Sequence, residues 1–485
     1  MALYKHRIDT QELDTRVAIP VEGTAGLQVI FGTAPVNMAE NPSAAVNTPI
    51  IAYSYEEAVK QLGFSYDFDK YTLCQSIYAN FVLFQNAPII LVNVLDPSKV
   101  GHTKAYTSGS VTVANKKATL DAEGILLATL TVTAGEVTLT KGTDYIAAFN
   151  SAGGVDITLL DTAATASVTA ISATGTQLDP DGVTAADIVG GYDASTGAET
   201  GIECVRKVYP KLGLVPGLLL APGWSSTATV AAALRAKTTE LNGLFTCEAV
   251  IDMGAAAGSK YTDLNAAKTT LGVIDEHCIL LWPMLKVGDY KMAYSAIWAA
   301  MTSRCDTDHG DVPYKSPSNE LLGVSAAILA DGTEVLLDIN QAELVNSYGI
   351  VTAINNQGWK SWGNNTSIYP SSTDPKDRWI ACRRMMSWYR NHFILTYHDK
   401  VDDPASYRLT EAFVDSENMY LNSLTASGAI AGGVIEFNEE ENPITEILDG
   451  NIVFYTRIAF WTPAKYILNK IEFDPTILSA ALGGE

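Results

Sequence analysis

The densest group of metal-type ligands in the sequence consists of Asp306, Asp308, His309 and Asp311. Asp306 and Asp308 match the first two ligand positions of an EF-hand calcium loop, whose carboxylate oxygens bind a hard cation. The later positions do not match, because Gly310 comes one residue too early and Pro317 stands where the bidentate glutamate belongs. The pattern therefore favours a solvated turn, and no metal site is predicted.

Two further pairs of residues could support nucleophilic catalysis. His277 and Cys278 are adjacent in an apolar run, but neighbouring side chains of a strand point to opposite faces, so they cannot form the hydrogen-bonded pair that a nucleophile needs. Ser225 and Ser226 follow another apolar run without the G-x-S-x-G elbow of a hydrolase. We expect these serines at the start of a helix over residues 228–241.

Sites for phosphate groups and cofactors are not indicated. The sequence has no P-loop and no G-x-G-x-x-G after a strand, and the glycines of residues 428–433 do not fit that spacing. No catalytic residue, cofactor-binding residue or cofactor is therefore predicted. Four tryptophans close in sequence could line a ligand site, but such residues also form cores and subunit interfaces: Trp359, Trp362, Trp379 and Trp388.

Length and charge restrict the classes of function. The 485 residues are too many for one core and predict about three domains. A net charge of -22 argues against a nucleic-acid binder and against docking on anionic membranes. No apolar run reaches the ~20 residues of a membrane span, and the N-terminus lacks the apolar region of a signal peptide. Six scattered cysteines without a C-x-x-C motif predict free, buried thiols in a protein made and used in the cytoplasm.

The elements that would have to position any site follow an α/β pattern. Apolar strands are expected at residues 26–32, 89–95, 217–221, 247–253 and 277–281. Helices are expected between them at residues 55–62, 71–84, 184–189, 199–209, 228–241, 261–271 and 291–301. Continuous apolar strands that alternate with helices predict a parallel sheet covered on both faces.

One stretch interrupts this pattern. Residues 101–179 contain no Trp, Cys, Met, Arg or Pro, and short alternating runs are separated by glycine-containing turns. The runs lie at residues 110–113, 125–133, 136–140, 155–160 and 166–171. Strands at this spacing predict a small all-β sandwich inserted into the α/β sequence.

The last third of the chain becomes mixed α+β. A helix is expected over residues 377–396, with Cys382, Met386, Tyr389 and Phe393 on one stripe, and a second helix over residues 407–424. Residues 451–461 alternate between apolar and polar faces as a strand does, and a second strand-like run covers residues 466–473. A strand near a chain end can be added to the sheet of a neighbouring molecule.

Several stretches, in this order, resemble contractile phage tail sheath proteins, including those of bacteriocin-like particles. They are residues 21–35, residues 188–193 continuing to Trp224, residues 282–287 with 311–319, residues 344–350 with Trp362-Gly363, and the C-terminal run. None is a strong motif alone, but the ordered set covers nearly the whole chain. The weakest stretch is the insert, which varies in such proteins.

The resemblance implies a subtilisin-like α/β middle domain, used without a catalytic triad, and a helical sleeve of stacked rings around a tail tube. It implies the following division: an N-terminal arm 1–20, the first part of the α/β core 21–100, the inserted sandwich 101–180, the α/β sheath domain 181–355, a C-terminal sheath domain 356–470 and a C-terminal arm 471–485. The expected partners are further copies of the chain, a tail tube protein, and baseplate and tail terminator proteins, with no nucleic acid and no membrane insertion. The expected location is the tail of a virion or particle assembled in the bacterial cytoplasm.

The resemblance also singles out two sets of residues. The arms would link subunits by strand exchange through Tyr4, Ile8, Leu13, Val17, Ile471, Phe473, Ile477 and Leu478. A basic group near the 377–396 helix stands out in an acidic protein and could face an acidic tube or form local ion pairs: Lys376, Arg378, Arg383, Arg384 and Arg390.

Two other classes of function remain open at this point. A cytosolic α/β hydrolase would need a nucleophile, a base and oxyanion donors that converge at the end of a strand. A static structural protein, such as a tube or surface-layer subunit, would usually be smaller and β-rich or would carry an export signal.

Overall fold

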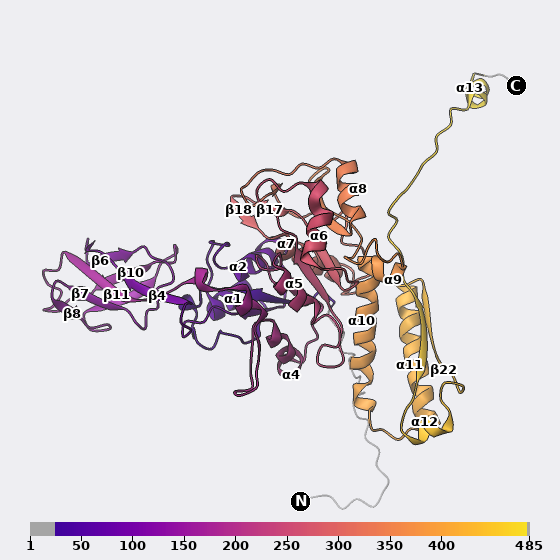
Figure 1. Ribbon diagram of the computed structural model, residues 1–485, viewed down its shortest axis with the longest axis horizontal. Coiled ribbons are helices and arrows are strands. Elements are labelled where there is room, and N and C mark those ends of the chain that lie inside the picture. The colour runs from indigo at the N-terminus through magenta and orange to yellow at the C-terminus, as the bar shows by residue number, and fades with distance from the viewer. Residues whose placement is uncertain (1–24, 483–485) are drawn as a thin grey trace, which may run out of the picture.

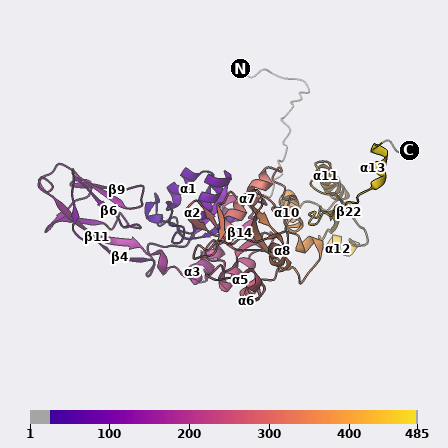
Figure 2. The ribbon, with the colours of Figure 1, turned by 90° about the horizontal axis from the view of Figure 1, so that it is seen from above.

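The computed structural model describes residues 25–482. They form three regions in a row, with a β-sandwich at one end, an α/β body in the middle and a helical module with a long C-terminal extension at the other (Figures 1 and 2). The expected N-terminal arm, residues 1–20, lies outside the described residues. No helix between residues 25 and 482 combines the length and the apolar character that crossing a membrane requires.

The body is built on an eight-stranded sheet with the order β2-β3-β1-β14-β15-β16-β20-β21. The six inner strands are parallel and the two edge strands are antiparallel to their neighbours. The strands are β1 (Gln28–Gly32), β2 (Ile50–Ala52), β3 (Ile89–Asn93), β14 (Leu218–Leu220), β15 (Glu248–Asp252), β16 (Cys278–Leu281), β20 (Ile350–Asn355) and β21 (Trp359–Trp362). The five strands expected from apolar runs are confirmed, because strands buried on both faces carry little polar alternation.

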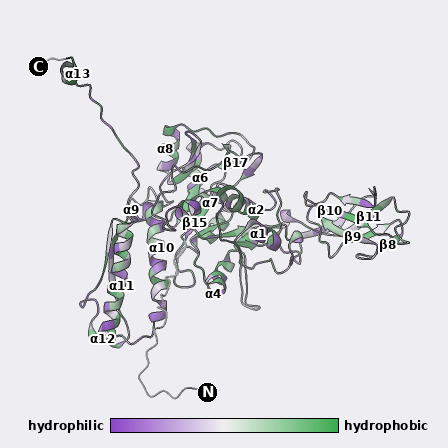
Figure 3. Cartoon of the chain, turned by 180° about the vertical axis from the view of Figure 1, so that it is seen from behind, coloured by the Kyte–Doolittle hydropathy of each residue, from purple (hydrophilic) through white to green (hydrophobic). Residues whose placement is uncertain are grey.

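Helices cover both faces of this sheet (Figure 2). On one face lie α1 (Tyr55–Leu62), α2 (Leu73–Ile77), the π-helix η2 (Tyr78–Phe84) and α7 (Tyr294–Thr307). On the other lie α3 (Ala185–Val189), α5 (Ala228–Arg235) and α6 (Leu264–Leu271). The body also contains two further helices, α4 (Val208–Leu212) and α8 (Ile339–Ser347), and short 3-10 turns at Val36–Met38, Pro180–Gly182, Gly201–Lys207 and Tyr261–Asp263. A hairpin is formed by β12 (Gly191–Asp193) and β13 (Ala198–Thr200). A small separate sheet consists of β17 (Met284–Val287), β18 (Tyr290–Met292) and β19 (Ala326–Ile328). Figure 3 shows hydrophobic residues concentrated in the sheet and the helices on it.

Three expected helices differ in extent. Helix α5 ends at Arg235 instead of residue 241, where the Thr238 hydroxyl donates to the Arg235 carbonyl at 2.8 Å. Residues 201–207 form a 3-10 helix before the short α4. Helix α7 begins at Tyr294 because the preceding residues belong to β18, and it continues to Thr307.

The insert leaves the body after β3 and returns before α3. Its first and last strands pair antiparallel, so that entry and exit lie side by side (Figure 1). One sheet contains β4 (Thr103–Thr107), β5 (Val111–Thr112), β7 (Thr131–Ala134), β8 (Val137–Leu139) and β11 (Ala170–Leu178), and the other contains β6 (Lys117–Leu120), β9 (Tyr145–Phe149) and β10 (Val155–Leu159). The two sheets enclose a separate hydrophobic core. Strands β4, β6 and β9 carry Thr, Lys and Ala at many positions and were not recognised from periodicity.

The C-terminal module packs beside the body through the long helix α10. It contains α9 (Pro375–Arg378), α10 (Ile380–Tyr397), a 3-10 turn (His398–Lys400), α11 (Tyr407–Ala426), β22 (Gly432–Phe437), α12 (Ile444–Leu448) and β23 (Phe454–Ala459). The expected helices and the first expected strand are confirmed. The second expected strand, residues 466–473, has no regular structure in the single chain, and the short helix α13 (Pro475–Ala481) follows it.

Candidate functional site

The acidic residues at the end of α7 are engaged with protein partners. Asp306 is buried and paired with Arg384, Asp308 binds Arg304 at 3.0 Å, and Asp311 accepts a hydrogen bond from the Thr307 hydroxyl at 3.2 Å. Within residues 25–482 no group of three or more acidic, histidine or cysteine side chains is arranged to hold a metal.

The expected nucleophile candidates also lack catalytic geometry. Cys278 is buried, and burial raises the pKa of its thiol well above the ordinary value, so the thiolate is disfavoured. His277 faces Glu248 instead, with 3.8 Å between Nδ1 and Oε1. All six cysteines are buried and unbridged.

Asp252 occupies the place where α/β enzymes commonly keep a functional group, the carboxyl end of a parallel strand. It accepts hydrogen bonds from the Ser225 hydroxyl at 3.1 Å and from the Ser295 amide at 2.8 Å. Ser225 is thus tied to Asp252 and is not the helix cap that the sequence predicted; Thr227 precedes α5. Within residues 25–482 no histidine is hydrogen-bonded to Ser225 or Ser295, and the contacts of both serines with Asp252 join strand β15 to helix α7.

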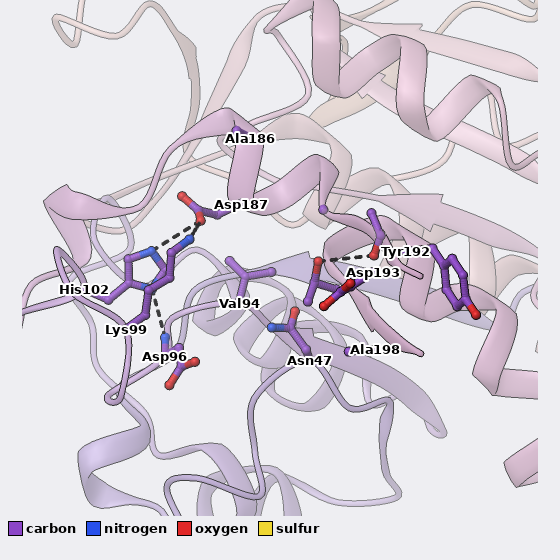
Figure 4. Close-up of a pocket in the computed structure, with 13 residues that line it drawn as sticks. Asn47, Val94, Asp96, Lys99, His102, Ala186, Asp187, Tyr192, Asp193 and Ala198 are labelled. Atoms are coloured by element: carbon purple, nitrogen blue, oxygen red, sulfur yellow. Dashed lines mark hydrogen bonds and ion pairs between the residues drawn. The ribbon is translucent and has the colours of Figure 1, made fainter. Parts of the chain in front are cut away.

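A polar cavity of about 490 Å³ lies where the insert joins the body (Figure 4). His102 is buried there, with Nδ1 accepting a hydrogen bond from the Asp96 amide at 3.1 Å and Nε2 3.5 Å from Asp187. Asp187 also pairs with Lys99 and caps helix α3 through Thr184. Burial opposes ionisation, but the hydrogen bonds from Lys99 and Thr184 prevail and lower the pKa of Asp187 to about 2. The contacts of Asp187 with Lys99 and Thr184, and that of His102 with Asp96, fix the neck of the insert, while His102 Nε2 has no hydrogen-bond partner among the described residues.

The basic group around α10 divides into buried and exposed members. Arg384 and Arg383 are 1% and 6% exposed and bind Asp306 and Asp377, so the expectation that they face a tube does not fit their burial. Arg378 stacks over the rings of Tyr369 and Trp379, at 4.4 and 4.1 Å from their centres. Lys376 and Arg390 are exposed.

The clustered tryptophans are mainly structural. Trp359 and Trp388 belong to the hydrophobic cores of the body and of the C-terminal module. Trp379 is buried and Trp362 is half-buried.

The C-terminal extension, residues 461–482, includes the described part of the expected arm (471–482) and carries several largely exposed apolar side chains. Figure 1 shows it running away from the module into solvent. The four residues that the sequence singled out there are largely exposed: Ile471 at 87%, Phe473 at 80%, Ile477 at 69% and Leu478 at 52%. Tyr466, Ile467 and Leu482 are exposed to 74–84%. Burial of each such side chain against another surface would stabilise that contact by about 1.5–3 kcal/mol.

Strands β22 and β23 form a two-stranded sheet whose two edges differ. Beside β22, the Asn418 side chain of α11 accepts from the Ile435 amide and donates to its carbonyl, both at 3.0 Å. Ile435 therefore points its backbone away from β23, and its register partner Thr456 must point its own backbone away from β22. Phe454 and Ile458 share this direction, because strands alternate with a period of two.

Within the described part of the chain, the outward backbone groups of Phe454, Thr456 and Ile458 have no hydrogen-bond partner, so the outer edge of β23 is open there, whereas the outer edge of β22 is closed at Ile435. An unpaired strand edge is a template for a further strand. The arms and this edge were not connected by the sequence reasoning, because the closing contact comes from Asn418, on a helix that precedes the hairpin.

Comparison with known proteins identifies relatives of this chain. No family model matches the chain. The tail sheath protein of Burkholderia phage BcepMu is 26% identical over 499 aligned positions, which cover 100% of this chain and 99% of the phage protein. The tail sheath protein of Escherichia phage P2 is 25% identical over 56% of this chain and 66% of its own length.

Two solved structures share the fold. A chain in the cryo-EM structure of the anti-feeding prophage baseplate aligns with a TM-score of 0.56 at 15% identity, over 97% of this chain and all of that chain. A chain of the PVC extracellular contractile injection system, whose sheath complex was solved in the contracted state, aligns with a TM-score of 0.59 at 15% identity, over 98% of this chain and 99% of that chain. The mixed α/β, multi-sheet architecture therefore corresponds to that of these two chains over almost their whole length.

Proposed function

The chain is a contractile tail sheath protein, a structural subunit and not an enzyme, and from this premise we propose how its copies are joined. The subunits polymerise around a tail tube and stay linked by strand exchange through their terminal arms while the sleeve contracts and drives the tube through a cell envelope. The observation that carries the proposal is the exposure of four apolar side chains of the C-terminal arm, Ile471, Phe473, Ile477 and Leu478, which are 52–87% exposed in the single chain.

The C-terminal arm of one subunit adds to the open edge of β23 in a neighbour. Main-chain hydrogen bonds do not depend on side-chain identity, and each contributes about 0.5–1.5 kcal/mol net. Burial of Ile471 and Phe473 would add about 1.5–3 kcal/mol each. Because such a link is made at one strand, it can persist while the larger surfaces between subunits repack.

The N-terminal arm takes part in the same way through Tyr4, Ile8, Leu13 and Val17, which lie outside the described residues. The further partners are a tail tube and the baseplate and tail terminator proteins, in a particle tail assembled in the bacterial cytoplasm. Among the basic residues, Lys376 and Arg390 have the exposure that contact with an acidic tube requires. A net charge of -22 supports the absence of nucleic-acid contacts.

We keep the domain division at residues 1–20, 21–100, 101–180, 181–355, 356–470 and 471–485, with a subtilisin-like core in the body. Separate hydrophobic cores in the insert and in the C-terminal module support it. The insert extends from the body on the side away from that module (Figure 1), which suits decoration of the outer surface of a sleeve.

The test is expression of the chain alone, with negative-stain microscopy for hollow helical tubes. A variant with Ile471→Asp and Phe473→Asp should remain folded by circular dichroism but form no long tubes. The matched control is Val137→Asp with Ile146→Asp, since these insert residues are also apolar and about half exposed, at 52% and 50%. Normal tubes from the arm variant would refute the linking role of the arm.

A further inference from the structure

Arg384 is the most deeply buried charge in the C-terminal module. Its side chain has no exposed surface, and that of its partner Asp306 is 4% exposed. The guanidinium forms a bidentate pair with Asp306: Nη1 donates to Oδ1 at 3.0 Å, and Nη2 donates to Oδ2. Helix α10 of the module is thereby fastened to helix α7 of the body.

The same guanidinium makes a third contact. Its Nη2 donates to the backbone carbonyl of Ala25 at 3.2 Å. Ala25 is the residue at which the described chain begins, just before strand β1, and it packs in the core of the C-terminal module. Arg384 therefore joins α10, α7 and the start of β1 at a single point.

The next residue is held from the other side. The Ser303 hydroxyl of α7 donates to the Gly26 carbonyl at 2.7 Å. A side chain on Gly26 would lie 3.2 Å from the Asp306 carboxylate and from the Ser303 backbone, so the chain passes in close contact with α7. The root of the N-terminal segment, defined here as Ala25 and Gly26, is fixed by two helices.

Stability alone does not require this arrangement. Replacing a buried ion pair by apolar residues of similar size is often neutral or stabilising, because the charges must be desolvated. An apolar pair could not, however, donate to the Ala25 carbonyl. The distinctive contribution of the arginine is the geometry of its fork, which reaches a carboxylate and a carbonyl at once.

The remaining guanidinium donor points to the same conclusion. Arg384 Nε has no partner among the described protein atoms, and Arg384 lines a small cavity of about 10 Å³ together with Glu248 and Ser387. That volume holds one water molecule. This group of buried polar side chains between α10 and the strand ends fixes α10 in one position, whereas apolar side chains alone would allow several.

We propose that Arg384 is the anchor of the N-terminal segment, and that it passes tension on the residues before Ala25 to the body and to the C-terminal module together. The inference rests on the proposed function, in which the N-terminal arm links subunits. Without the anchor, a pull on the arm would first detach Leu27, the residue just before β1, whose carbonyl accepts hydrogen bonds from the Gly217 and Leu218 amides at 2.9 and 3.0 Å, and would then peel β1. Peeling would open the centre of the sheet, because β1 lies between β3 and β14.

The test uses the full chain with Asp306→Leu and Arg384→Met together, which removes both charges and the Ala25 contact. Assembled tubes should form, but after contraction is triggered they should break into fragments several-fold shorter than wild-type sheaths. Hydrogen exchange at the Gly217 and Leu218 amides should be at least about tenfold faster, whereas the Leu280 amide in β16 should keep its protection. The control is Arg390→Met, which removes an exposed arginine from the same helix.

A milder variant covers the case in which the double variant does not fold. Ser303→Ala removes the tether on the Gly26 carbonyl and leaves the Arg384–Asp306 pair intact, so it should also accelerate exchange at Gly217 and Leu218. Wild-type exchange and intact contracted sheaths in both variants would overturn the anchor. Deletion of residues 1–24 distinguishes the linking role of the N-terminal arm from the anchoring role of Arg384. Normal tubes from the deletion would refute the linking role. If the deletion abolishes tubes but the Arg384 and Ser303 variants behave as wild type, only the anchoring role is refuted.

Discussion

Replacing Arg384 alone by methionine should be far more damaging than replacing it together with Asp306. The single change leaves a carboxylate buried without its counter-ion, because the Asp306 side chain is only 4% exposed. Removing one partner of a buried pair costs about 3–5 kcal/mol, a large part of a total stability of about 5–15 kcal/mol. For a unit of the size of the body, this corresponds to a fall in Tm of about 6–20 °C.

The loss should depend on pH in a defined direction. Burial raises the pKa of Asp306 above its ordinary value of 3.8, and Arg384 opposes that rise. Without Arg384 the pKa in the folded state climbs further. A group whose pKa is higher in the folded state contributes stability that is complete below the unfolded pKa and is lost as the pH rises toward the folded pKa. The deficit of Arg384→Met should therefore be smaller at about pH 5 than at about pH 7.

The measurement is urea unfolding followed by tryptophan fluorescence, at chain concentrations below those of tube formation. Asp306→Leu combined with Arg384→Met should recover most of the loss and remove the added pH dependence. A single variant within about 1 kcal/mol of wild type at neutral pH, the usual range of an exposed pair, would show that the pair is not buried as described.

Other perturbations have equally definite outcomes. The Ile471→Asp, Phe473→Asp variant should lose tubes in negative-stain images while its circular dichroism is unchanged. Lys268 donates to the Tyr348 and Tyr369 carbonyls at 2.6 and 2.8 Å, and burial lowers its pKa from 10.5 to about 8. Because the folded chain releases this proton at a lower pH than the unfolded chain does, the free energy of unfolding should rise between about pH 8 and pH 10.5 in urea titrations, and Lys268→Met should flatten that rise. Asp187→Asn should destabilise the neck of the insert at neutral pH, which faster hydrogen exchange of the α3 amides would show. The stability of the variant should approach that of the wild type as the pH falls toward 2, because Asp187, with its lowered pKa, contributes stability only while it is ionised. Asn418→Ala should open the outer edge of β22 and cost about 1–3 kcal/mol for the backbone groups of Ile435 left without partners, and microscopy should show irregular aggregates beside tubes.

The parts that the sequence predicted well are those in which one local rule decides. Continuous apolar runs located the inner strands of the sheet, and alternation located β23. The composition of residues 101–179 separated the insert, because a small sandwich draws on Thr, Val and Gly for strands and turns. The linking residues of the C-terminal arm came from the resemblance to sheath proteins, while periodicity indicated only a strand-like run at residues 466–473.

The parts that failed depend on contacts between distant segments. Arg383 and Arg384 do not lie on the apolar face of their helix, so a prediction that assumes one buried face places them in solvent. Helix α10 instead lies between the body and α11, so that several of its faces are buried. The partner of Arg384 is Asp306, which precedes it by 78 positions in another region of the fold. Local patterns carry no signal for such a pair.

The strand expected at residues 466–473 did not form for a related reason. A strand needs hydrogen-bond partners for its backbone, and residues 466–473 pair with no other strand among residues 25–482, from which they extend away (Figure 1). Under the proposed function, its apolar residues would form a strand against the sheet of a neighbouring copy, as β-augmentation requires.

The asymmetry of the β22–β23 sheet limits how an assembly can be built on it. Asn418 occupies the backbone of Ile435, so the module offers strand pairing along β23 alone. If both terminal arms of neighbouring subunits join the same sheet, the second can pair only with the first, and the order of strands becomes β22, β23, arm, arm. Each arm would then be held partly by the other, so that removing the inner arm also releases the outer one. Loss of the inner arm should therefore disconnect two neighbours from each module, a larger effect than its own hydrogen bonds account for.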